Sequence, residues 1–201
     1  MTKLILDYDT SHHVIRLWLN PKEYFSIHLQ VSLEQLGVGH YGTIFFHDIH
    51  DMKYKLFTTK STLWTAVGDL ESYIKDTLLG KRELHRLYTK GLGYEFNQDQ
   101  HKKLNGLKKL SWDGSNYLLW DTYDRPCTWL YSETGMFYFA ITPLYLKKMY
   151  HVSYKVFIKN YHPYIVRMVT ANDLERLLTQ ISELAIIMRT NTNRWRTLHG
   201  Y

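Results

Sequence analysis

The stretch YFSIHLQVSL, residues 24–33, decides the class of fold that the sequence predicts. Its apolar residues alternate with Ser, His and Gln, which is the period-two pattern of a strand with one buried face. Two β-rich segments precede it, at residues 3–8 and 13–19, and the sequence Asn-Pro-Lys-Glu at 20–23 is typical of a turn. An antiparallel meander is therefore expected in the N-terminal part of the chain.

Two later segments have the period of an amphipathic helix. Residues 61–79 carry apolar side chains at spacings of three and four, and Gly80 is expected to end this helix. Residues 170–188 show the same period, with an apolar stripe made of Leu174, Leu177, Leu178, Ile181, Leu184 and Ile187. They begin with Thr-Ala-Asn-Asp at 170–173, which resembles a helix-capping box with Asp in place of Glu or Gln. These two helices are long enough to cover a sheet.

The central part of the chain predicts a second antiparallel section. Residues 43–49 are expected to form a fourth strand before the first helix, and residues 81–111 are basic and interrupted by glycine, so that only short helical or irregular structure is expected there. The strands of the second section are expected at residues 117–123, 128–132 and 136–142, and a short helix at 153–160. The sequence thus predicts an α+β fold in which an N-terminal meander and central hairpins pack with two long amphipathic helices and shorter ones.

Length and composition favour one domain. No repeat, linker or low-complexity tract interrupts the 201 residues, so a single domain over residues 1–201 is expected, with residues 189–201 as a mobile basic tail. Cys127 is the single cysteine, which suits a reducing compartment. The sequence begins without an export signal and contains no apolar run of about 18 residues, so we expect a cytoplasmic protein without a membrane span.

A glycine motif, GVGHYG at residues 37–42, has the spacing of a dinucleotide-binding loop. That chemistry needs a helix N-terminus directly after the glycines to meet the pyrophosphate. The residues that follow are extended in character, so the motif is interpreted as a turn between strands. No cofactor is expected.

The cluster HDIHD at residues 47–51 is the most metal-like part of the sequence. On an expected strand, Asp48 and His50 share one face, and a metal-dependent hydrolase or nuclease could use them as ligands. The sequence does not supply a third ligand, which would come from His12, His13 or Asp7, and His40 lies close upstream. Structural or surface histidines are the favoured interpretation, and no bound metal is expected.

The C-terminal half is basic. Residues 151–201 carry seven Lys and Arg against three Asp and Glu, and residues 189–201 contain three arginines around Trp195 and no acidic residue. Arginine for phosphate and tryptophan for base stacking make nucleic-acid binding an alternative function. Cations at the end of a helix also complement its dipole, which is the structural interpretation.

Aromatic residues are abundant, with 17 tyrosines and six tryptophans, and many fall in the central hairpins. Side chains on strands alternate between two faces, so these aromatics cannot all enter one core. Either helices cover both faces, or one face binds a partner. We expect the hairpin region, residues 117–142, to contribute to a partner-binding surface through at least one exposed Trp or Tyr, and the candidate binding residues are Trp120, Trp129 and Tyr131.

Two stretches resemble a protein family: WLYSETGMFYFAITPLY at residues 129–145 and YKVFIKNYHP at residues 154–163. They are similar to small bacterial immunity proteins encoded beside polymorphic toxins, and the resemblance covers roughly residues 117–190. It implies a stoichiometric inhibitor that binds a cognate toxin domain. The basic charge departs from the acidic surfaces usual against toxins that cut nucleic acids. A non-enzymatic protein-binding module is therefore the expected function.

Overall fold

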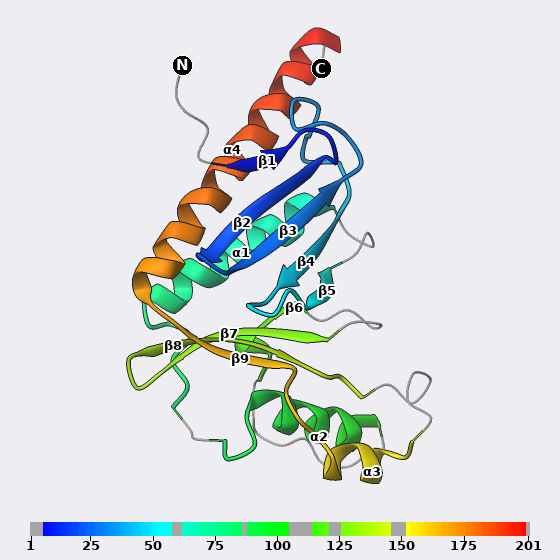
Figure 1. The fold of residues 1–201 in the computed structure, drawn as a ribbon, viewed down its shortest axis with the longest axis vertical. Helices are drawn as coiled ribbons and strands as arrows, with labels where there is room; N and C mark the ends of the chain where they lie inside the picture. The colour runs from blue at the N-terminus through cyan, green and yellow to red at the C-terminus, as the bar shows by residue number, and fades with distance from the viewer. Residues whose placement is uncertain are drawn as a thin grey trace. The chain divides into compact units, whose positions relative to one another are not determined.

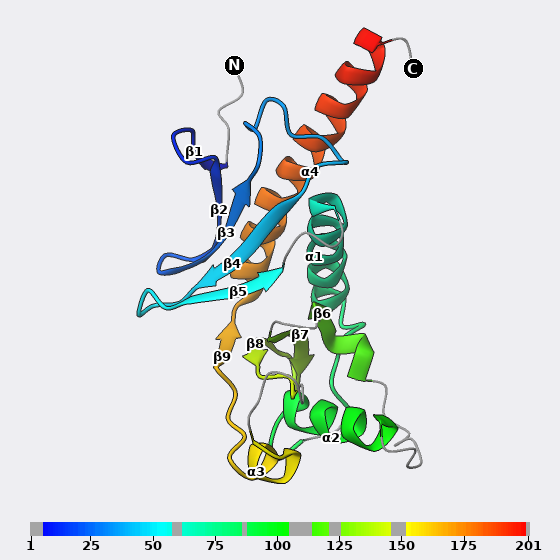
Figure 2. The ribbon, with the colours of Figure 1, turned by 90° about the vertical axis from the view of Figure 1, so that its right-hand side faces the viewer.

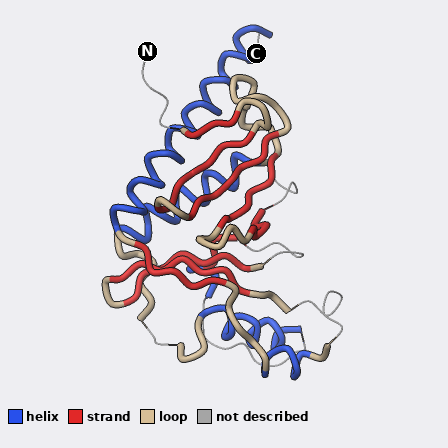
Figure 3. Tube along the Cα trace, viewed as in Figure 1, coloured by secondary structure: helices blue, strands red, loops and turns tan. Residues whose placement is uncertain are grey.

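The computed structural model describes residues 6–57, 62–85, 88–104, 114–120, 126–145 and 152–199. The chain divides into two compact units, and the second, residues 79–169, is inserted between the two segments of the first, residues 1–78 and 170–201. Each unit combines an antiparallel sheet with helices (Figures 1 and 3), which confirms the predicted α+β class. The single domain expected over residues 1–201 stays a prediction.

The first unit contains the expected meander. Its sheet has the order β1-β2-β3-β4-β5, and every neighbouring pair is antiparallel. The strand expected at residues 24–33 ends earlier than predicted, because the chain turns away after Leu29 and buries Leu33 and Leu36 from a loop. The last strand of this sheet was not predicted. The strands are β1 (Asp7–Asp9), β2 (Val14–Asn20), β3 (Glu23–Leu29), β4 (Gly42–His47) and β5 (Lys53–Phe57).

Two helices, α1 (Leu63–Leu78) and α4 (Ala171–His199), lie on one side of this sheet (Figure 2). The register aligns Ile15 with Ile27 and Leu17 with Phe25, so buried apolar side chains form rows on the helix side. The helices contribute their own apolar stripes to this core. The buried helix residues are Leu63, Ala66, Val67, Leu70, Ile74, Leu174, Leu177, Ile181, Leu184, Ala185 and Met188.

The start of α4 is the predicted capping box. The Thr170 hydroxyl accepts a hydrogen bond from the backbone N–H of Asp173 at 3.1 Å, and the Asp173 carboxylate accepts from the Thr170 N–H at 3.1 Å. Two orphan donors of the first turn are thus satisfied. At its other end the helix continues to His199, so the expectation that it ends near Met188 is wrong.

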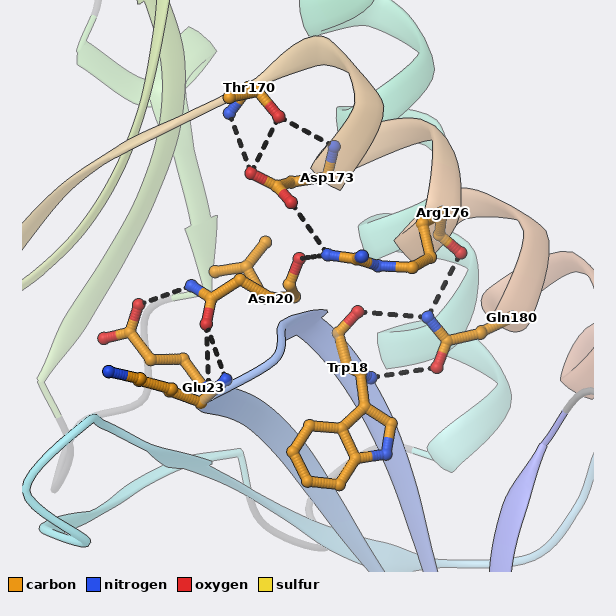
Figure 4. A network of polar contacts seen from close by, with 9 residues as sticks. Trp18, Asn20, Glu23, Thr170, Asp173, Arg176 and Gln180 are labelled. Carbon is orange, nitrogen blue, oxygen red and sulfur yellow. Dashed lines mark hydrogen bonds and ion pairs between the residues drawn. The ribbon is translucent and has the colours of Figure 1, made fainter.

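Side chains of α4 also bond the edge of β2, beyond the short strand β1 (Figure 4). Gln180 accepts a hydrogen bond from the Trp18 backbone N–H at 2.9 Å and donates to the Trp18 carbonyl at 3.0 Å. Arg176 donates to the Leu19 carbonyl at 2.6 Å and pairs with Asp173. The helix therefore takes the place of a neighbouring strand at this edge.

The second unit has a four-stranded antiparallel sheet in the order β6-β7-β8-β9. Its strands are β6 (Leu118–Trp120), β7 (Cys127–Glu133), β8 (Met136–Thr142) and β9 (Ile165–Val169), and its helices are α2 (Leu92–Leu104), the short 3₁₀ helix Gly114–Tyr117 and α3 (Tyr154–Lys159). Three of these strands and α3 were expected, and β9 was not. Helix α2 lies within residues 81–111, where only short helical or irregular structure was expected. The part of the strand expected at residues 121–123 lies outside the described residues.

Helix α2 packs against the sheet through a small, close contact. A Cβ atom at Gly93 would overlap the Tyr161 hydroxyl and the Thr142 side chain, so only glycine permits this approach. One turn later, the buried Asn97 donates to the Pro143 carbonyl at 2.8 Å and accepts from the Tyr145 N–H at 2.6 Å. The helix is thereby fixed to the end of β8. None of the helices in the described parts of the chain is both long and apolar enough to cross a membrane.

Candidate functional site

The three aromatic residues expected at a partner surface lie in the interior. Trp129 is fully buried, its ring packs edge-on against Phe96 of α2 at 5.3 Å, and its indole N–H donates to the Thr142 hydroxyl. Tyr131 and Trp120 are buried as well, and burial raises the pKa of Tyr131 to about 12. None of these three side chains is therefore exposed, and helix α2 covers the face that holds Trp129. A role of residues 117–142 in partner binding stays a prediction.

The same face of this sheet carries an exposed apolar surface farther along. The register pairs Tyr138 with Met168 and Ala140 with Val166, and Tyr164 precedes them with the same side-chain parity. The exposed fractions are 49% for Tyr164, 46% for Val166 and 67% for Met168. Together with Met136 and the half-buried Tyr138, these residues form what we call the β8–β9 surface, which comprises Met136, Tyr138, Tyr164, Val166 and Met168.

A cavity of about 380 Å³ continues this surface. Tyr164 belongs to both, and the other walls come from α3 and its flanks, including Val152, Val156 and Phe157. Val152 and Val156 are themselves exposed. The second unit therefore presents a continuous apolar strip from β8 across β9 to α3.

The metal-like cluster is a turn. Strand β4 ends at His47, so the period-two argument that placed Asp48 and His50 on one face does not apply. The buried Asp48 carboxylate instead accepts hydrogen bonds from the backbone N–H groups of His50 and Met52, each at 2.9 Å, and shapes the β4–β5 hairpin. Within the described ranges, no three His, Cys, Asp or Glu side chains are grouped so that they could hold a metal ion.

The glycine motif is a loop between strands, as predicted, because β4 rather than a helix follows it. A Cβ atom at Gly37 would lie 2.8 Å from the Thr192 hydroxyl, so this glycine allows the loop to approach α4. The Val38 N–H donates to the same hydroxyl at 2.9 Å. The motif thus has a packing role in the first unit.

The residues expected as a basic tail form the end of α4. Arg189 lies over the Trp64 ring at 5.0 Å, and the exposed Trp195 stacks on His199 at 4.5 Å. One face of the Trp195 indole is thereby occupied by an imidazole. Nucleic-acid binding by the C-terminal half stays a prediction.

A polar groove of about 500 Å³ lies on the face of the first sheet opposite α1 and α4. The register explains its composition, because Tyr24 pairs with His47, His47 with Lys53, and Ser26 with Arg16 across adjacent strands. The Ser26 hydroxyl lies between two imidazoles, 3.2 Å from Nε2 of His28 and 2.9 Å from Nε2 of His47. Sequence analysis missed this cluster, because its members become neighbours only through strand pairing.

The electrostatics of the groove disfavour further positive charge. Burial lowers the pKa of both His28 and His47, and the nearby Lys53 ammonium lowers both further. His47 also stacks on the Tyr24 ring, with centroids 4.4 Å apart. The groove therefore holds two neutral imidazoles beside a permanent cation.

Comparison with known proteins gives no relative: no protein-family model, curated protein or solved structure matches this chain.

Proposed function

We propose that the protein is a non-enzymatic protein-binding module that engages its partner through the β8–β9 surface. The observation that carries this proposal is a row of three exposed apolar side chains, Tyr164 just before β9 and Val166 and Met168 on it. Solvated strands usually alternate apolar and polar faces. A contiguous apolar strip that is open to water, with Tyr and Met at its centre, has the composition of an interface.

The kind of partner follows from the resemblance to immunity proteins, which spans both β8 and β9. In this proposal the partner is a cognate toxin domain, and the protein neutralises it by stoichiometric binding in the bacterial cytoplasm. A gene for a large toxin next to the gene for this protein would support it.

Partner capture from the native host tests the proposed surface. We expect Met168→Lys and Val166→Lys each to weaken binding of the captured partner at least tenfold, because a lysine cannot be desolvated in an apolar interface. Ile186→Lys is the matched control, since Ile186 is an exposed apolar residue on α4 in the other unit. Dissociation constants can be measured by isothermal titration calorimetry. Equal affinity for all three variants and the unmodified protein would place the interface elsewhere.

A further inference from the structure

The groove on the first sheet has features that protein binding at the β8–β9 surface does not use. Most of the residues that line it are polar or charged, and its volume of about 500 Å³ lies within the range of small-molecule sites. From its charge and its hydrogen-bonding groups, we propose that this groove binds the phosphate group of a small molecule. The proposal is independent of the function proposed above.

The charge comes from Lys53. Its ammonium nitrogen lies 3.4 Å from Nε2 of His28 and 3.9 Å from the centre of the Phe45 ring. Among the described residues it forms no ion pair with a carboxylate. Arg16 is the other permanent cation of the groove. It forms ion pairs with the carboxylates of Asp7, at 3.3 Å, and Asp9, at 3.6 Å, which compensate its charge. Lys53 is thus the uncompensated cation, and a lysine acts as a point charge for phosphate.

The hydrogen bonds come from the Ser26, His28 and His47 cluster. All three side chains point from adjacent strands to the same place, and their polar atoms lie within 3.2 Å of the shared hydroxyl. Nδ1 of His47 is buried and makes no hydrogen bond, although the exposed Asp51 carboxylate is 3.8 Å away. A phosphate offers several acceptor oxygens, which matches a hydroxyl, two imidazoles and an ammonium better than the two oxygens of a carboxylate.

An anion in the groove would change which protonation state of the two imidazoles is favoured. The charged groups that face them are Lys53, Arg16, Asp9, His12 and Asp51. A bound phosphate dianion favours the imidazolium form, so the pKa of both His28 and His47 rises on binding. By linkage, the phosphate dianion binds more tightly to the protein whose His28 and His47 are protonated than to the one in which they are neutral.

Nuclear magnetic resonance of the imidazole groups in the full chain, titrated with inorganic phosphate at constant ionic strength, tests this. We expect saturable shifts of the His28 and His47 signals and a higher pKa for both at saturation, whereas the exposed His50 shows neither. Lys53→Gln should weaken phosphate binding at least tenfold. Lys22→Gln, at an exposed turn of the same unit, should leave it unchanged.

Three results would overturn the proposal. The first is the absence of saturable shifts with phosphate, and the second is equal binding by Lys53→Gln and the unmodified protein. The third is equally tight binding of acetate, which would show that a single negative charge suffices. Circular dichroism of each variant confirms that it is folded.

Discussion

Gln180 replaces a strand at the edge of β2 with a single amide group (Figure 4). Both backbone groups of Trp18 point away from β3, and β1 is too short to reach them. The side-chain oxygen and nitrogen of Gln180 satisfy one group each, in the way that a neighbouring peptide would. A buried backbone group without a hydrogen-bond partner destabilises the folded state. Gln180 therefore contributes more to stability than a polar residue on a helix usually does.

We expect Gln180→Leu to lower the free energy of unfolding by about 1–3 kcal/mol, because two backbone groups of Trp18 lose their partner while remaining shielded from water. Gln30→Leu is the control, since Gln30 is exposed, and it should change stability by less than about 0.5 kcal/mol. Urea unfolding followed by circular dichroism measures both. A Gln180→Leu variant as stable as the control would show that water satisfies the β2 edge.

Replacing glycine with alanine in two of the helices should change the stability of the protein in opposite directions. Gly93→Ala places a methyl group against Tyr161 and Thr142, and we expect it to destabilise the protein by about 1–3 kcal/mol through overpacking. Gly68→Ala in α1 meets no atom within 4 Å and should stabilise by about 0.5–1 kcal/mol, because alanine is the better helix former. Thermal unfolding compares them directly. A neutral Gly93→Ala would contradict the close approach of α2 to β8.

At the scale of elements, α4 shows how well the spacing of apolar residues predicts which side chains of a helix are buried. Its predicted stripe included Leu178 and Ile187, which are only half-buried, and it omitted Gln180 and Ala185, which are buried. Leu174, Leu177, Ile181 and Leu184 were predicted as core residues and are buried. The pattern of apolar residues therefore predicts which side of the helix is buried. It does not identify a buried polar residue that has a specific hydrogen-bond partner.

We expect Leu184→Ala to cost about 2–5 kcal/mol, since Leu184 is fully buried between α4 and its neighbours in the first unit. Leu198→Ala, in the last turn of the same helix, should cost less than about 0.5 kcal/mol because Leu198 is largely exposed. Chemical denaturation distinguishes the two. Equal effects would mean that the burial of this helix differs from the structure.

The elements that sequence analysis missed have identifiable physical causes. Helix α2 has few apolar residues, of which Leu92 and Phe96 are buried, and Gly91 and Gly93 at its start are typical of a break. Strand β9, with the sequence IVRMV, has apolar residues on both faces and its one polar residue, Arg167, on the more buried face, so it lacks the alternation that marks a half-buried strand. Because neither was predicted, the burial of Trp129 and the exposure of Met168 could not be predicted either.

At the scale of the whole molecule, the two histidines of the groove predict a dependence of stability on pH. Their pKa values in the folded state lie below the usual imidazole value of 6.5, mainly through burial. As the pH falls through that value, the unfolded chain binds protons that the folded chain does not. The free energy of unfolding therefore decreases, and it stays high above the ordinary imidazole pKa.

Urea unfolding at about pH 7.5 and about pH 5.5 measures this loss. We expect the double variant His28→Gln/His47→Gln to lose less stability between the two than the unmodified protein does. His50→Gln should behave like the unmodified protein, because His50 is exposed. A loss of the same size in all three proteins would assign the effect to other groups.

The site could be predicted less well than the fold. Strand and helix positions follow from local patterns, whereas the groove depends on register, which brings Tyr24, His47 and Lys53 into one row. The insertion of residues 79–169 into the first unit is also hidden, because no linker or change of composition marks its boundaries. Both the groove and the boundaries of the two units depend on contacts between residues that are far apart in the sequence.

The insertion has a consequence for synthesis on the ribosome. The sheet β1–β5 and α1 emerge first, but α4, which covers the rest of the apolar face and closes the β2 edge, follows only after the entire second unit. At roughly 5–20 residues per second, residues 79–169 need on the order of five to twenty seconds to emerge. For that time the apolar residues that α4 covers in the folded protein have no cover, so we expect the nascent chain to bind chaperones that hold unfolded chains. We expect a chain that ends before residue 170 to remain in that state and to be degraded by proteases.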